Sequence, residues 1–119
     1  MPTVRGREEI AAFFSSLLSP FEGTMHTVGN IQLQWEGEGR IRSRSYFQAY
    51  HWLSSTGPDP QRPADLISTG VYLDDFRLTP DGWRINSRQR RNVGPSPVGV
   101  GRLPARLQGL GGAAQPDQL

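Results

Sequence analysis

The sequence contains no cysteine, no lysine and no long hydrophobic run. Without cysteine, disulfide bonds and thiolate-bound metal ions are excluded. A helix that spans a membrane needs about 20 apolar residues in succession, and no stretch of the sequence provides them. The short apolar stretch 10–14 follows two glutamates, so it does not resemble a signal peptide. These features predict a cytoplasmic protein with no membrane partner.

Apolar residues make up only 35% of the 119 residues, which is low for a packed domain. The deficit lies mainly in the last quarter, which is rich in glycine, proline, alanine and glutamine and shows no periodicity. Such a segment cannot bury enough apolar surface to offset the entropy lost on ordering. The sequence therefore predicts one folded domain over residues 1–92 and a disordered tail over 93–119.

The pattern of apolar residues predicts one helix followed by four strands. From Gly6 onward, apolar residues recur at helical spacing, and Pro20 would end this helix because it lacks a backbone N–H group. Alternating apolar and polar residues predict strands over 24–35, 40–53, 66–78 and 83–91. Turn residues fill the stretches between them. This order predicts an α+β fold in which an antiparallel meander packs on the helix.

The two histidines carry the clearest chemical potential. His26 lies on the strand 24–35. His51 lies near the end of the strand 40–53, on the same face as Phe47 and Ala49, which we expect to point inward. An imidazole titrates near neutral pH, so it can take a proton next to a carbonyl group or return one to a leaving hydroxyl group. Alternatively, both histidines are hydrogen-bonded residues at strand edges.

The facing of the strand 24–35 depends on one glycine. Strict alternation places Asn30 on the same face as His26 and places Leu33 and Trp35 on the opposite face. A bulge at Gly29 would change this assignment, because one extra residue reverses the alternation.

Two other classes of function find little support in the sequence. The histidines are 25 positions apart and lack the HxH or HExxH spacing of zinc sites, so we predict no metal and no other cofactor. Arginines gather in 40–44 and 88–91, but no aromatic pattern recurs among them, and the net charge is only +2. We interpret them as a solvated or interface surface and expect no nucleic-acid partner.

Five short motifs occur in the order found in one known family. They are GREEI (6–10), TMHTVGN (24–30), RSYFQAYH (44–51), GVYLD (70–74) and TPDGWRI (79–85). Together they span roughly residues 4–92, and they resemble the SnoaL-like domains of the nuclear-transport-factor-2-like superfamily. That superfamily includes polyketide cyclases, scytalone dehydratase, steroid isomerases and bile-acid dehydratases. The resemblance implies an α+β cone, in which a curved antiparallel sheet wraps around helices and encloses an apolar pocket.

The resemblance also implies roles for individual residues. His26 resembles the pocket histidine on the strand after the helix, and His51 resembles the second histidine of scytalone dehydratase. Asp74 resembles the acidic residue of the next strand, where it could fix a tautomer or act as the base; alternatively, it is part of a solvated pair with its neighbour. The candidate catalytic residues are therefore His26, His51 and Asp74. The candidate substrate-binding residues are Asn30, Phe47 and Tyr72.

The activity that the resemblance implies is of the lyase or isomerase type. It would be a cofactor-free dehydration, isomerisation or cyclisation of an apolar polycyclic or aromatic molecule, carried out by a homo-oligomer. The alternative is a non-catalytic ligand-binding or dimerisation module, because one fold hosts many functions.

The sequence departs from the family at its start. Typical members begin with helices that close the mouth of the cone and carry a tyrosine and an aspartate used by the dehydratases. Here Met1 lies five residues before the Gly-Arg-Glu helix. We therefore expect an N-terminally incomplete cone, either because the recorded start is too far downstream or because this copy is truncated. Exposed apolar surface on the helix and the sheet would follow.

Overall fold

The computed structural model describes residues 1–54, 59 and 61–94. It contains one helix and four strands, which are α1 (Arg7–Leu18), β1 (Phe21–Trp35), β2 (Arg40–Leu53), β3 (Leu66–Thr79) and β4 (Gly82–Asn92). The strands form one antiparallel sheet in the order β1-β2-β3-β4, which confirms the predicted α+β fold and its meander. The predicted disordered tail, 93–119, lies outside the described residues except for its first two positions. Within the described part of the chain, no helix is long and apolar enough to cross a membrane.

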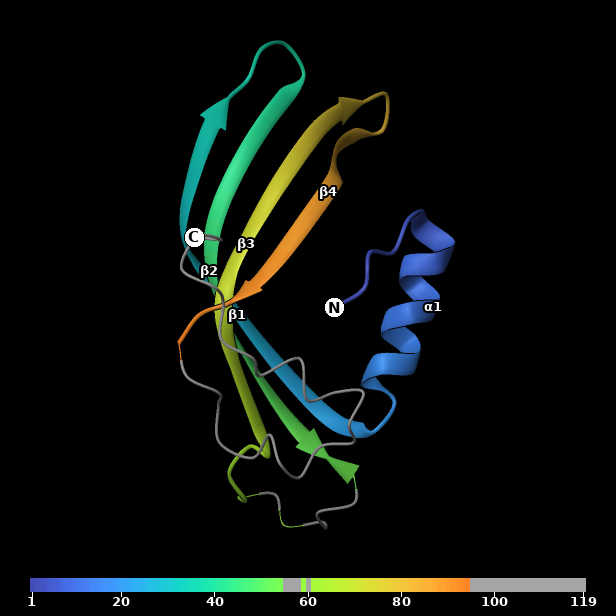
Figure 1. The fold of residues 1–119 in the computed structure, drawn as a ribbon, viewed down its shortest axis with the longest axis vertical. Helices are drawn as coiled ribbons and strands as arrows, with labels where there is room; N and C mark the ends of the chain where they lie inside the picture. Colours follow the sequence, from blue (N-terminus) through green and yellow to red (C-terminus); the bar gives the residue numbers. More distant parts are fainter. Residues whose placement is uncertain (55–58, 60, 95–119) are drawn as a thin grey trace.

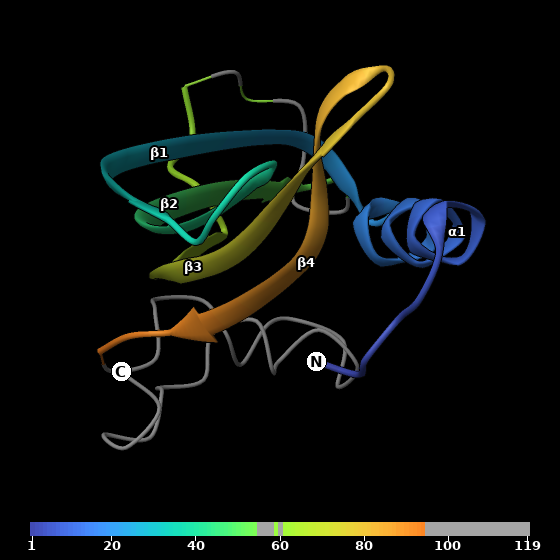
Figure 2. The same ribbon diagram turned by 90° about the horizontal axis from the view of Figure 1, so that it is seen from above.

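The sheet is curved, and α1 stands on its concave side (Figure 1). Seen from above, the strands follow a bent surface and α1 lies beside it, next to the start of β1 (Figure 2). We call the concave side the inner face. It is formed by every second residue of β2, from Ile41 to Leu53, and by their partners on the neighbouring strands.

Helix α1 is attached to the sheet near its C-terminal end. Leu17 packs with Phe21 against the buried side chains of Leu53 and Leu66. No residue of the helix is fully buried, and Phe14 remains 44% exposed. Much of the predicted apolar stripe is therefore open to solvent.

The predicted facing of β2 is confirmed. Residues on the inner face are buried from Ser43 to Leu53, whereas the residues between them are partly or fully exposed. Phe47, Ala49 and Tyr72 form one buried cluster on this face. His51 lies on the same face and is only 4% exposed.

A bulge interrupts β1. The register with β2 shifts between Gly29 and Gln32, so that Asn30 and Ile31 lie opposite a single residue of β2. Asn30 adopts a φ of 51°, a left-handed conformation that asparagine tolerates better than most residues. The bulge suspected at Gly29 is therefore present, one position further along.

The bulge changes which residues of β1 point inward. His26 pairs with Ala49 before the bulge, whereas Leu33 and Trp35 pair with residues 43 and 41 after it. All three consequently share the inner face, which corrects the assignment by strict alternation. Leu33 and Trp35 are 60% and 70% exposed, so this part of the inner face is apolar and open.

A second irregularity occurs in β4. The register with β3 shifts between Asp75 and Phe76, which makes Asn86 the extra residue of β4. After Asn86, Arg88 and Arg90 point to the inner face. Strict alternation from the start of the strand would place both on the outer face. Arg88 is exposed there, in agreement with the interpretation of 88–91 as a solvated or interface surface, whereas Arg90 is partly buried and departs from it.

Candidate functional site

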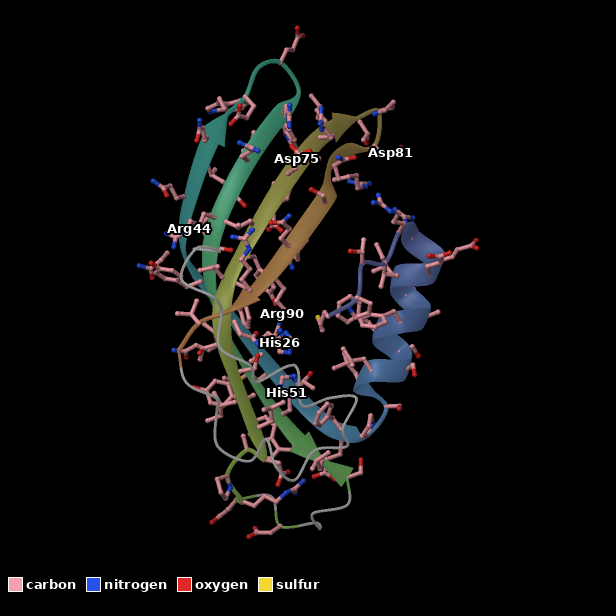
Figure 3. The ribbon with its side chains drawn as sticks, viewed as in Figure 1. His26, Arg44, His51, Asp75, Asp81 and Arg90 are labelled. Carbon is pink, nitrogen blue, oxygen red and sulfur yellow. The ribbon has the colours of Figure 1, made fainter. Side chains whose placement is uncertain are left out.

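The structure brings the two predicted histidines together. The ring centroids of His26 on β1 and His51 on β2 are 5.3 Å apart, and the ring planes meet at 64°. His26 is exposed on the inner face, whereas His51 is buried beneath it, against the ring of Phe21 at 4.8 Å. Figure 3 shows the pair on the side of the sheet that faces α1. The site thus contains one accessible and one enclosed imidazole.

The segment that precedes β3 fixes the backbone around His51. The N–H group of Asp65 donates a hydrogen bond to the carbonyl oxygen of His51 at 2.9 Å. The Asp65 carboxylate accepts one from the N–H group of Leu53 at 2.8 Å. Arg62 donates to the carbonyl oxygen of Leu53 at 3.0 Å. Because Asp65 is itself buried, these bonds hold the end of β2 in place.

Arg90 on β4 is a third member of the site. It lies beside the two histidines on the inner face (Figure 3). Its guanidinium carbon is 4.9 Å from the centre of the Phe47 ring, and it donates a hydrogen bond to the hydroxyl group of Ser68. An arginine remains charged at any physiological pH, so the site holds a permanent cation next to two imidazoles.

The surroundings favour the neutral form of both imidazoles. Contact with the sheet partly desolvates the His26 ring, although the residue is exposed, and lowers its pKa; the positive charge of Arg90 lowers it further. The pKa of His51 falls to about 4, mainly through burial and then through the charges of His26 and Arg90; the backbone carbonyl groups of Leu66 and Ala49 oppose this shift in part. Both rings are therefore neutral at pH 7, the form that accepts a proton.

One ring nitrogen of the site lacks a partner. Nδ1 of His51 is buried and makes no hydrogen bond within residues 1–54, 59 and 61–94. Buried polar atoms are nearly always satisfied in native proteins, so such an exception calls for an explanation.

The buried histidine predicts a pH-dependent stability. The pKa of His51 is about 4 when folded and near 6.5 when unfolded, so the unfolded chain binds the proton first. The free energy of unfolding should therefore decrease as the pH drops from 6.5 towards 4. The protonation of His51 alone should account for a loss of about 3 kcal/mol. Urea unfolding between pH 7 and pH 4 measures the slope, and His51→Gln, which stays neutral, should flatten it.

The comparison needs one control. Because the pKa of His26 is lowered as well, the variant His26→Gln is the control, and it should keep most of the slope that His51→Gln removes. A His51→Gln protein that loses stability on acidification as steeply as the parent would contradict the assignment.

Asp74 lies on the inner face but away from the histidine pair. Ser68 of β3 lies in the same cross-strand row as His26, and Asp74 is six residues further along β3. At the usual rise of a strand, Asp74 is therefore about 20 Å from that row. Its carboxylate, which is 6% exposed, accepts two hydrogen bonds from Arg88 at 2.7 and 2.9 Å. The structure therefore does not bring Asp74 to the imidazoles but joins it to Arg88, whose guanidinium carbon is 4.0 Å from the centre of the Tyr72 ring.

The three candidate substrate-binding residues occupy different positions. Phe47 and Tyr72 are stacked with ring centroids 4.4 Å apart and are buried, so they form the floor of the inner face under Arg90. Asn30 is exposed and lies in the bulge of β1.

Sequence reasoning did not find Arg90 or Ser68. Strict alternation from Trp83 places Arg90 on the outer face, and only the extra residue at Asn86 turns it inward. The sole local signal was the polar pair Asn86-Ser87 in an otherwise regular strand, and such a pair does not fix the position of a bulge.

Comparison with known families agrees with this geometry. Residues 1–89 match the SnoaL-like domain. The chain belongs to the SnoaL-like domain family. The resemblance drawn from the five motifs is thereby confirmed, and the curved sheet with its single described helix is the corresponding architecture. No curated protein matches the chain significantly.

Solved structures share the fold of this SnoaL-like chain. The Kfla4162 protein from Kribbella flavida is 20% identical, with a TM-score of 0.62 over 71% of this chain and 56% of that protein. A protein from Novosphingobium aromaticivorans, provisionally assigned as a scytalone dehydratase, is 25% identical, with a TM-score of 0.62 over 75% and 56%. A type 2 hexachlorocyclohexane dehydrochlorinase (LinA) is 14% identical, with a TM-score of 0.67 over 82% and 63%. The chain thus spans less than two thirds of the length of each.

Proposed function

We propose that this SnoaL-like domain performs cofactor-free acid–base chemistry on an apolar carbonyl compound. The observation that carries the proposal is the contact of His26 with His51, at 5.3 Å between ring centroids, beside the guanidinium of Arg90. The reaction is a dehydration, an isomerisation or a cyclisation, because each can begin with removal of a proton next to a carbonyl group.

Each residue of the group has a distinct task in this proposal. His26, neutral and exposed, takes the proton from carbon. The electron pair of the broken C–H bond forms a C=C bond, and the π pair of the carbonyl group moves to its oxygen, whose negative charge the Arg90 cation stabilises. His51 stays neutral beneath His26 and holds its ring in place. The proton then returns to carbon or to a leaving hydroxyl group.

The remaining candidate residues take supporting tasks. Asp74 acts through Arg88, which it holds with two hydrogen bonds, rather than as a base. Phe47 and Tyr72 form the floor on which a flat substrate rests, and Asn30 contacts its rim.

Two features support an apolar, aromatic or polycyclic substrate. The inner face next to the histidines carries the exposed side chain of Val28, which is 46% exposed and pairs with Phe47. Two solved relatives bear names that denote eliminations, one a dehydrochlorinase and one a provisional scytalone dehydratase. An elimination on an apolar ring fits a site in which neutral imidazoles adjoin an apolar surface.

Hydrogen–deuterium exchange tests the proposal without knowledge of the natural substrate. The bicyclic ketone 1-tetralone has exchangeable hydrogens next to its carbonyl group, and proton NMR in D2O follows their loss. We expect the full chain to accelerate this exchange above the rate in buffer containing free imidazole. If 1-tetralone binds and its exchange is not accelerated, the chain is a ligand-binding module and the catalytic proposal fails.

The proposal includes a homo-oligomer in the cytoplasm. Ile10 and Phe14 of α1 are 41% and 44% exposed, and apolar surface of this kind favours association. Analytical ultracentrifugation should show a species larger than one chain that Phe14→Ser shifts towards the monomer, and cell fractionation tests the location.

A further inference from the structure

Side chains of β2 and β3 contact Arg90 and help to hold it in place. Its guanidinium donates a hydrogen bond to the hydroxyl group of Ser68 on β3 and lies 4.9 Å from the ring centre of Phe47 on β2. A free arginine side chain has about 2 kcal/mol of rotamer entropy, so it adopts one position only where contacts of this kind select it.

Ser68 is placed to act on the histidine site. It is fully buried, with 0% exposure. Its partner on β2 is Ala49, and the partner of Ala49 on β1 is His26, so Ser68 and His26 belong to one cross-strand row of the inner face. A hydrogen bond to Ser68 therefore draws the Arg90 side chain back along the sheet towards the imidazoles.

The ring of Phe47 is positioned in turn by Gly70. A Cβ atom on Gly70 would lie 2.9 Å from a Phe47 ring atom, which is closer than real contacts allow. Because glycine has no side chain, the ring lies over the backbone of β3 and is stacked on Tyr72 at 4.4 Å. The contact surface under Arg90 is thus buried.

We propose that Ser68 is a positioning residue whose buried hydroxyl, together with the ring of Phe47, fixes the Arg90 guanidinium beside His26 and His51. The consequence of this positioning for turnover rests on the proposed function, in which Arg90 stabilises negative charge on the substrate.

The imidazole of His26 provides a readout, because its pKa depends on the position of the Arg90 charge. The titratable group in contact with it is His51 of β2, and the permanent charge that acts on it is Arg90 of β4. The ion pair of Asp74 with Arg88 lies six residues further along β3, away from this row. Helix α1 carries its charges only in its first turn, at positions 7–9, remote from the start of β1.

The test is a proton NMR titration of both histidines in the full chain. Removing the charge with Arg90→Gln should raise the pKa of His26, since a nearby cation disfavours the imidazolium. Ser68→Ala should raise it in the same direction by a smaller shift, because the released guanidinium moves towards solvent. Ser45→Ala, which removes another buried inner-face hydroxyl, is the matched control and should leave the titration unchanged.

A double variant separates positioning from a general structural effect. If Ser68 acts through Arg90, then adding Ser68→Ala to Arg90→Gln should produce no further shift. The proposal is overturned if Ser68→Ala leaves the His26 titration unchanged, or if it shifts the titration equally with and without Arg90. The titration needs no substrate, so its outcome is independent of the 1-tetralone exchange that tests the proposed function.

Discussion

Replacing His26 with alanine is expected to slow the exchange of 1-tetralone hydrogens by about 10²–10⁴-fold, the usual contribution of a positioned general base. His26 is the accessible imidazole of the pair, and its pKa is lowered by burial and by Arg90, so it is available as a neutral base at pH 7. Proton NMR under saturating ketone measures the loss.

The fold should survive this substitution, because the His26 side chain is exposed and not part of the buried clusters. Thr27→Ala is the matched control, since its side chain points to the outer face of the same strand. In the parent protein, the exchange rate should rise with pH through the lowered pKa of His26 and level off near neutrality. A His26→Ala protein that exchanges 1-tetralone at the parent rate would eliminate His26 as the base.

Adding a single methyl group at Gly70 is expected to cost about 3 kcal/mol of stability. The new Cβ atom would lie 2.0 Å from the backbone carbonyl oxygen of Arg91 and 2.9 Å from the Phe47 ring. A backbone atom of a neighbouring strand cannot move aside without breaking the ladder, so the β3–β4 pairing must give way. Urea unfolding of Gly70→Ala measures the loss.

Gly29→Ala is the control for this prediction. A Cβ atom on Gly29 meets nothing within 4 Å, and the residue does not have a positive φ. Its substitution should change the stability by less than about 1 kcal/mol, because only the intrinsic preference of the strand is altered. If the two alanine variants unfolded at the same urea concentration, the close approach at Gly70 would not be a feature of the folded protein.

The helix, the four strands and the facing of β2 follow from the sequence because they depend on local periodicity. Between Ser43 and Leu53 the strand has no irregularity, and counting by twos identifies its buried side, including His51. The start of β1 at Phe21, before the predicted 24, depends instead on its pairing with Leu53, a contact distant in sequence.

The composition of the site depended on features without a clear local signal. Each bulge reverses the alternation, so one extra residue decides whether a whole strand end points in or out. Asn30 brings Leu33 inward, and Asn86 brings Arg90 inward. The resemblance to SnoaL-like domains identified the histidine pair and Asp74 as candidates. It did not identify the partner of Asp74, because Arg88 points to the inner face only as a result of the bulge in β4.

The curvature of the sheet also gives the protein an internal optical reporter. Trp35 on β1 and Trp83 on β4 come from the two opposite edges of the sheet, yet their ring centroids are 6.2 Å apart over the inner face. Trp52, the remaining tryptophan, projects from the outer face of β2. In a Trp52→Phe protein, the intrinsic fluorescence therefore originates only from the concave side. A molecule that binds against these two exposed indoles displaces water from them and shifts their emission to shorter wavelength, so binding at this end of the inner face can be titrated without a label.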